Sequence, residues 1–298
     1  MEGNLIGKVH NGNYDIMIYS DGTKVRRNSL DCFIPDKPES LDYKITNMCD
    51  RGCPFCHEGS VPNGLHGDIM NDRFVETLNP YTEIAIGGGN PLEHPDLVPF
   101  LEKCRRLHLI PNMTVNQVHF QSRQRMIREL VDRKLIYGLG ISLVSPTDRF
   151  ISLARQYPNA VIHIINGVHT MEDFRRLYDH GLKILILGYK DFRRGEDFHS
   201  PEVDARKERT YVFLPEILEH FRVVSFDNLA LSQLDVRSLL TPDEWDRFYM
   251  GGDGTFTMFV DSVSRTFSTS STTPIGERQP MMDDIKPMFD YVRRHHNG

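Results

Sequence analysis

Three closely spaced cysteines are the residues of this chain whose types and spacing could carry chemistry. Cys49, Cys53 and Cys56 stand three and two residues apart, just after a strand-like run. Three thiolates on one short loop can bind three irons of a [4Fe–4S] cluster. Because most simple clusters take four protein thiolates, one iron would remain free to bind another molecule. We therefore place the predicted chemistry at that open iron.

The chain has five cysteines, and the other two, Cys32 and Cys104, have no partner at ligand spacing. An odd count in a chain of 298 residues argues against a secreted disulfide scaffold. It favours a reducing compartment, in which thiolates serve a metal or catalysis. We interpret Cys32 and Cys104 as small apolar side chains in the interior.

Structural zinc is the alternative for the same three cysteines. His57 or His66 could complete a site of three cysteines and one histidine. Such sites usually stand in small loop-rich modules, whereas here the cysteines follow a strand of a long α/β region. This alternative predicts a non-catalytic, zinc-stabilised α/β binding protein.

The composition is that of an ordinary globular protein, with 39% hydrophobic and 26% charged residues. A net charge of −6 argues against a surface built as a whole to bind nucleic acid. The first residues show no signal-peptide pattern, and the longest apolar run, 184–187, is far shorter than a membrane span. We expect a cytoplasmic protein without a membrane partner.

Short β-rich runs alternate with amphipathic helical patterns over residues 39–239. The helical patterns include 96–104, 124–131 and 171–178. The expected strands are 41–47, 83–87, 111–116, 138–143, 160–165, 183–188 and 222–227. Alternation of this kind predicts parallel βα units, which could form an open or closed barrel or a doubly wound sheet.

The two ends of the chain have other patterns. Residues 1–38 predict an N-terminal β-hairpin appendage with a turn at 20–23. Residues 240–298 predict a short helix that begins at Thr241, a hairpin over 255–268 and a final helix over 285–292. We expect this last segment to be a small α+β cap over the strand ends.

Unusual residues follow the expected strands, at the edge where parallel α/β folds bind their ligands. A glycine cluster follows the second strand, although it could also be a turn or a phosphate cradle. It lacks the lysine and hydroxyl of a P-loop. The residues in question are Gly87, Gly88, Gly89, Asn90 and Pro91, then Asn116, Ser142, Asn166 and Tyr189.

Several charged or titratable residues have two interpretations. His57 and Glu58 beside the cysteines could support the cluster or face a substrate, or could form a solvated loop pair. The basic loop 190–194 could bind an anionic substrate group or simply be solvated. His163 is interpreted as a core histidine.

The cysteine spacing, with aromatic Phe55 just before Cys56, resembles the cluster loop of the radical S-adenosylmethionine (radical SAM) superfamily. The strand that ends in Gly87–Pro91 resembles the glycine-rich motif of that superfamily, which binds the amino group of the methionine moiety. The family's motif commonly has an acidic residue where this chain has Asn90. The resemblance covers residues 40–190.

The resemblance implies a partial (β/α)6 TIM-like barrel with one [4Fe–4S] cluster and S-adenosylmethionine bound at its open iron. An electron from the cluster would cleave the sulfonium to a 5′-deoxyadenosyl radical, which abstracts a hydrogen from a substrate. No cysteine follows Cys104, so we expect a single cluster. A flavodoxin- or ferredoxin-like electron donor is implied as a partner.

The same resemblance implies roles for individual residues. Asn116 and Ser142 match polar positions near the cofactor, and Asn166, Leu187 and Tyr189 fall where the fifth and sixth strands flank its ribose and adenine. The resemblance names no catalytic side chain. It leaves the substrate open among a peptide, a nucleoside or nucleic acid, and a small metabolite.

Overall fold

Seven parallel strands follow one another both along the chain and across the main sheet. The structure is a computed structural model and describes residues 3–30 and 32–295. The strands are β4 (Ser40–Thr46), β5 (Glu83–Gly88), β6 (Ile110–Asn116), β7 (Gly138–Ser142), β8 (Ala160–Ile165), β9 (Lys183–Leu187) and β10 (Val223–Phe226). They match the seven expected strands closely. Their order in the sheet never reverses, which excludes a doubly wound sheet and confirms a partial barrel.

Alternation along each strand separates an outer face from an inner face. In β4, Leu41, Tyr43 and Ile45 are fully buried among the helices, so Asp42 and Lys44 point to the barrel interior. The helices that follow the strands are α1 (Leu97–Arg106), α2 (Gln117–Ser122), α3 (Gln124–Asp132), α4 (Asp148–Ala154), α5 (Met171–Leu177), α6 (Arg194–Phe198), α7 (Pro201–Val212), α8 (Leu214–Glu219) and α9 (Asn228–Gln233). Short 3-10 turns lie at Arg73–Thr77, Pro91–Glu93, Val236–Leu239 and Ile275–Glu277.

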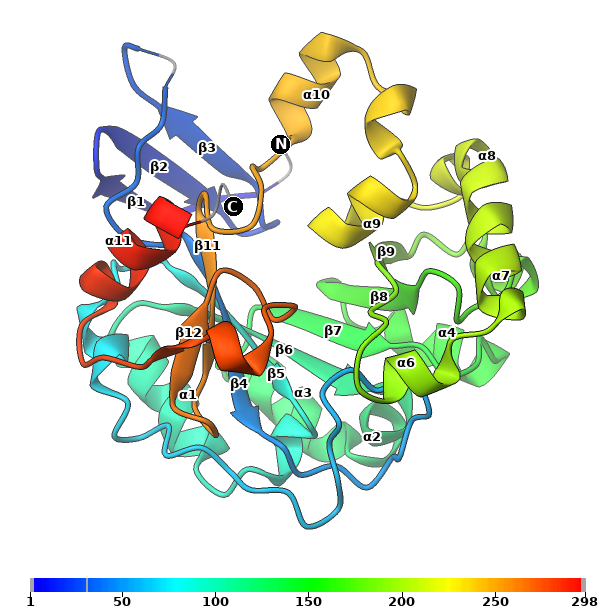
Figure 1. Cartoon of the computed structure of the whole chain (residues 1–298), viewed down its shortest axis with the longest axis horizontal. Coiled ribbons are helices and arrows are strands. Elements are labelled where there is room, and N and C mark those ends of the chain that lie inside the picture. The colour runs from blue at the N-terminus through cyan, green and yellow to red at the C-terminus, as the bar shows by residue number, and fades with distance from the viewer. Residues whose placement is uncertain (1–2, 31, 296–298) are drawn as a thin grey trace.

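The C-terminal segment continues the main sheet on the other side of β4. After α10 (Pro242–Phe248), β11 (Thr257–Asp261) pairs with β4 in parallel, and β12 (Thr266–Ser268) and β13 (Gln279–Pro280) follow in antiparallel order. The hairpin of β11 and β12 was predicted, but its pairing with β4 was not. Met258 and Val260 are buried in the core, together with the final helix α11 (Ile285–His295), and this burial fixes β11 beside β4 (Figure 1).

The N-terminal strands β1 (Leu5–Asn11), β2 (Tyr14–Tyr19) and β3 (Lys24–Arg27) form a separate three-stranded sheet. Tyr14, Ile16 and Ile18 of this sheet pack against Ile110, at the amino end of β6, and Phe256. The appendage thus lies below the barrel, at the end opposite the cysteines. No helix in the described ranges combines the length and apolarity that a membrane crossing needs.

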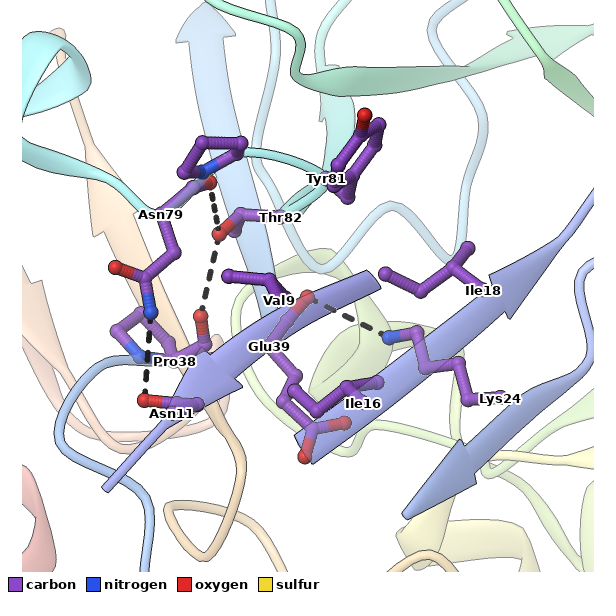
Figure 2. Close-up of a pocket in the computed structure, with 11 residues that line it drawn as sticks. Val9, Asn11, Ile16, Ile18, Lys24, Pro38, Glu39, Asn79, Tyr81 and Thr82 are labelled. Carbon is purple, nitrogen blue, oxygen red and sulfur yellow. Dashed lines mark hydrogen bonds between the residues drawn. The ribbon is translucent and has the colours of Figure 1, made fainter. Parts of the chain in front are cut away.

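Buried charges fasten this appendage to the barrel. Lys24 lies 2.6 Å from Glu83. It also donates to the Glu39 carbonyl, and Figure 2 shows this hydrogen bond. Arg26 donates to both carboxylate oxygens of Glu39, at 2.7 and 3.0 Å, and Tyr14 donates to the same carboxylate. The Glu39 side chain is only 2% exposed and that of Arg26 13%, so the ion pair is largely shielded from water.

Glu39→Gln is therefore expected to lower the free energy of unfolding by about 2 kcal/mol or more, because it leaves Arg26 buried without its counter-charge. Urea denaturation measures this change. Asp15→Asn, which removes the exposed partner of Lys8, is the matched control and should change stability by less than about 0.5 kcal/mol. Equal effects of the two variants would contradict this account of the appendage.

Candidate functional site

The cysteine loop begins at the end of β4, at the carboxyl edge of the barrel, and its second half runs beside its first half. The amide of Asn47 donates to the Leu65 carbonyl at 2.8 Å, and the amide of Cys49 donates to the Val61 carbonyl at 2.9 Å. Short bridges join Thr46 to His66 and Met48 to Val61. These bonds tie the two arms of the loop together, so the cysteines between them occupy a defined position.

Cys49, Cys53 and Cys56 are half-buried free thiols on this loop. Burial raises the pKa of the Cys49 and Cys53 thiols, and the charges of the neighbouring thiols of the trio raise both further. The three sulfurs therefore share one environment. Cys104 is fully buried in α1 as expected, whereas Cys32 is exposed, contrary to its interpretation as an interior side chain.

The two histidines considered as zinc ligands, His57 and His66, have other partners in the structure. His66 hydrogen-bonds the Thr46 hydroxyl at 2.9 Å and packs against His94, and His57 pairs with Glu58. Among residues 3–30 and 32–295, no three histidine, cysteine or acidic side chains are grouped as ligands of one metal ion. This finding covers the three cysteines as well, so only the contacts of the two histidines argue against zinc.

The glycine cluster at the end of β5 packs directly on the cysteine loop. A Cβ atom on Gly89 would lie 2.1 Å from the Met48 carbonyl oxygen, and one on Gly88 would lie 2.4 Å from the Thr46 carbonyl oxygen. Gly88 also has a φ of 107°, which favours glycine. Gly87 differs, because nothing lies within 4 Å of a Cβ placed there. Gly88 and Gly89 thus allow close packing on the cysteine loop, whereas Gly87 faces open space.

Asn90 and Pro91 lie within the protein. The Asn90 side chain is 2% exposed and accepts a hydrogen bond from the Leu92 amide at 3.3 Å, so it caps the turn that follows. Its own amide donates to the Met48 carbonyl at 2.6 Å. Asn90 thus supports the cysteine loop from behind, and the family's acidic residue has no counterpart at this position.

The residues predicted at the later strand ends fall into two groups. Asn116 caps α2 through the Val118 amide, and the buried Tyr189 donates its hydroxyl to the Gly195 carbonyl, so these side chains already have protein partners. Ser142 and Leu187 are half-buried on the inner face. The aromatic residue of the loop, Phe55, packs edge to face on Phe198 of α6.

Gln233 of α9 is a residue that the sequence analysis missed. Its side chain accepts from the Tyr189 amide and donates to the Tyr189 carbonyl, both at 2.9 Å. It also contacts the Asn166 amide nitrogen at 3.3 Å. It joins the ends of β8 and β9 from a helix that lies more than 40 residues away in sequence. A single glutamine on an amphipathic helix gives no signal of such a role.

A buried ion network supports the loop from the barrel side. Lys44 lies 2.7 Å from Glu58 and 3.3 Å from Asp261, which also pairs with Arg278. Burial opposes ionisation of Glu58, yet His57 and Lys44 hold its pKa well below the usual range. Burial and the charge of Lys190 lower the pKa of His57. Glu58 is therefore a supporting anion of the loop, not a solvated side chain.

The basic loop after β9 also contacts the cysteine loop. Arg193 donates to the Glu58 carbonyl, and Arg194 donates to the Ser60 carbonyl at 2.6 Å. Lys190 donates to Ser271 at 2.9 Å. The two arginines of the basic loop thus hold the cysteine loop in place.

Buried polar atoms without a partner gather at this same edge. The described residues include five such side-chain atoms: Asn47 Oδ1, Ser60 Oγ, His119 Nδ1, Asn166 Oδ1 and Arg194 Nε. Asn47 and Ser60 belong to the cysteine loop, and His119 touches it through a 2.6 Å hydrogen bond to Asp50. Because buried polar groups are nearly always paired, these atoms have hydrogen-bonding capacity left for a ligand or for water.

Comparisons with known proteins give one match in sequence and several in fold. A stretch of 90 residues, 28% of this chain, is 27% identical to the PqqA peptide cyclase of Gluconobacter oxydans, of which it covers 25%. The chain thus matches about a quarter of the length of that curated relative. No family model matches the chain.

Two solved structures of SuiB from Streptococcus suis share the fold. SuiB bound to the precursor peptide SuiA has a TM-score of 0.64 at 16% identity, over 89% of this chain and 68% of SuiB. SuiB alone has a TM-score of 0.65 at 13% identity, over 98% of this chain and 89% of that one. The fold of this chain is therefore one that SuiB also adopts.

The cysteine and glycine motifs resemble those of the radical SAM superfamily, and the chain shares the fold of SuiB. In the structure the two motifs lie at the ends of the neighbouring strands β4 and β5 of a partial barrel.

Gly89→Ala is expected to lower the free energy of unfolding by about 2 kcal/mol or more, because the new methyl group would overlap the Met48 carbonyl. Gly276→Ala is the matched control, since nothing lies within 4 Å of a Cβ at that position. Urea denaturation of both variants measures the effect. A Gly89→Ala protein as stable as Gly276→Ala would contradict the close packing described here.

Proposed function

We propose that this chain is a radical SAM enzyme that binds one [4Fe–4S] cluster through Cys49, Cys53 and Cys56. The proposal rests mainly on three half-buried free thiols on one hydrogen-bonded loop, at the edge of the barrel where unpartnered polar atoms gather. When bound, such a cluster supplies the electron that cleaves S-adenosylmethionine and so begins hydrogen abstraction from a substrate.

Several residues around the cysteine loop would each bind a different part of S-adenosylmethionine. Gly87 offers open space next to the loop, which suits the methionine part of S-adenosylmethionine. The unpartnered Asn166 Oδ1 can accept a hydrogen bond from the ribose or adenine. Ser142, Leu187 and Phe55 would line the remainder of the cofactor site.

We further propose a peptide as the substrate class. Three classes were open from the sequence, and the names of both relatives include a peptide: PqqA peptide cyclase, and SuiB bound to the precursor peptide SuiA. SuiB has also been solved with S-adenosylmethionine, with a TM-score of 0.59 to this chain at 15% identity. Free thiols and a cluster fit the reducing cytoplasm and a flavodoxin- or ferredoxin-like donor.

Replacing Cys49, Cys53 or Cys56 singly by alanine is expected to prevent cluster assembly. The variants should lack both the brown absorption near about 400 nm and the formation of 5′-deoxyadenosine from S-adenosylmethionine under dithionite. Cys32→Ala, at an exposed thiol outside the loop, is the control and should retain both properties. Iron analysis and chromatography give the two readouts. A Cys53→Ala protein that forms 5′-deoxyadenosine at the normal rate would disprove the proposal.

Gly87→Ala tests the cofactor position separately from the cluster. The structure accommodates a methyl group at this position, so folding and iron content should be unchanged. If S-adenosylmethionine occupies that space, its affinity should fall about tenfold or more, or about 1.4 kcal/mol. Equilibrium binding to the reconstituted protein measures this, with Gly276→Ala as control. Unchanged affinity would place the cofactor elsewhere.

A further inference from the structure

His163 is a histidine on the inner face of β8 whose ring has no partner in the protein. Its strand neighbours Ile162 and Ile164 are fully buried on the outer face, among the helices, so the imidazole lies inside the barrel. No described residue donates a hydrogen bond to this ring or accepts one from it. His163 is therefore not the core histidine that the sequence pattern indicated, because the ring nitrogens of a core histidine are normally bonded.

A glycine on the neighbouring strand β7 makes room for this side chain. Gly140 lies on the inner face, because Leu139 and Ile141 on either side of it are buried on the outer face. A Cβ atom on Gly140 would lie 2.5 Å from the nearest atom of the His163 ring and 2.7 Å from the Thr114 hydroxyl oxygen. The ring and the hydroxyl thus converge over Gly140 from the two strands that flank β7. A glycine within a strand often marks the close approach of a ligand.

His163, Thr114 and Gly140 line a cavity of about 540 Å³ inside the barrel, a volume within the range of small-molecule sites in proteins. On three neighbouring strands a cavity residue stands two positions before a residue predicted to bind the cofactor. The pairs are Ala85 and Gly87, Thr114 and Asn116, and Gly140 and Ser142. Two residues along a strand span about 7 Å, so the cavity lies one layer of side chains below the predicted cofactor. Space for a substrate group thus exists next to the place of the predicted chemistry.

The polar groups that converge in this cavity are uncharged. Burial alone lowers the pKa of His163 to about 4, so the imidazole is neutral at pH 7, and no charged group lies close enough to alter this. The Thr114 side chain is half-buried, and its hydroxyl also lacks a hydrogen-bond partner in the described part of the chain. Apolar residues such as Val161 and Leu185 form much of the remaining wall.

The charged residues on the wall balance one another. Glu83 pairs with Lys24 at 2.6 Å, and Asp21 accepts hydrogen bonds from two backbone amides, both at 3.0 Å. Lys183 is the cation that lines the cavity. These four charges sum to zero, so the cavity wall as a whole is neutral. A neutral and partly apolar enclosure does not favour a charged ligand.

We propose that this cavity binds an uncharged substrate side chain that ends in a carboxamide or a hydroxyl, with His163 and Thr114 as its hydrogen-bond partners. The inference rests on the proposed function and narrows its peptide substrate to one with such a side chain at the reacting position. A neutral imidazole and a hydroxyl each provide a donor and an acceptor. An apolar group would leave them unpaired, and an ion would lose its hydration without gaining a counter-charge. His163 and Thr114 are then residues that determine specificity.

The test compares three probes of similar size and shape, the N-acetyl amides of asparagine, aspartate and leucine. Their side chains end in a carboxamide, a carboxylate and an apolar branch. Calorimetric titration at pH 7.5 uses the reconstituted protein with S-adenosylmethionine bound. We expect the asparagine probe to bind at least tenfold more tightly than either of the other two.

Variants of the two residues test their part in this preference. His163→Leu should remove the preference for the asparagine probe over the leucine probe, whereas His163→Gln retains an uncharged donor and acceptor and should keep it. Thr114→Val, which hardly changes the size of the side chain, should reduce it. His10→Leu, at an exposed position of β1, is the control and should bind the probes as the wild type does. A merely structural role would change the affinity for all three probes alike, so the ratio of affinities is the decisive quantity.

The outcomes separate the two proposals. Equal binding of the three probes, no binding of any, or tightest binding of the aspartate or leucine probe would overturn the inference, while the formation of 5′-deoxyadenosine still supports the proposed function. An unchanged preference in both His163→Leu and Thr114→Val would place the ligand elsewhere and would also overturn it. A wild-type protein that assembles no cluster would overturn the proposed function, and the inference with it.

Discussion

The carboxyl edge of the barrel depends on a close approach between two backbones. The end of β5 lies so near the cysteine loop that a Cβ atom on Gly88 or Gly89 would overlap a carbonyl oxygen of Thr46 or Met48. The amides of Gly89 and Asn90 use this proximity and donate to those same carbonyls, at 2.7 and 2.6 Å. Backbone bonds of this length leave the loop little freedom. The glycines thus fix the thiols relative to the sheet before any cofactor binds.

Charged side chains hold the cysteine loop in addition to this backbone contact. Lys44 reaches the loop from inside the barrel through Glu58, and Arg193 and Arg194 reach it from the segment after β9. Ion pairs that are shielded from water are costly to break, because each would leave an uncompensated charge. The loop is therefore held from β4, β5 and the segment after β9 at once. A site that must hold three sulfurs in register benefits from such support.

The sequence predicted those parts of the fold that depend on local pattern. Apolar periodicity identified each parallel strand within one or two residues, and spacing identified the cysteine and glycine motifs. The sequence did not predict that β11 pairs with β4, because the pattern of a hairpin does not indicate which other strand the hairpin will pair with. Nor did it predict the function of Gln233, and it left open whether Glu58 supports the cluster, faces a substrate or is solvated. Their roles depend on partners that only the fold brings near, and a polar residue on a helix or in a loop has the same local pattern whether or not it has such a partner.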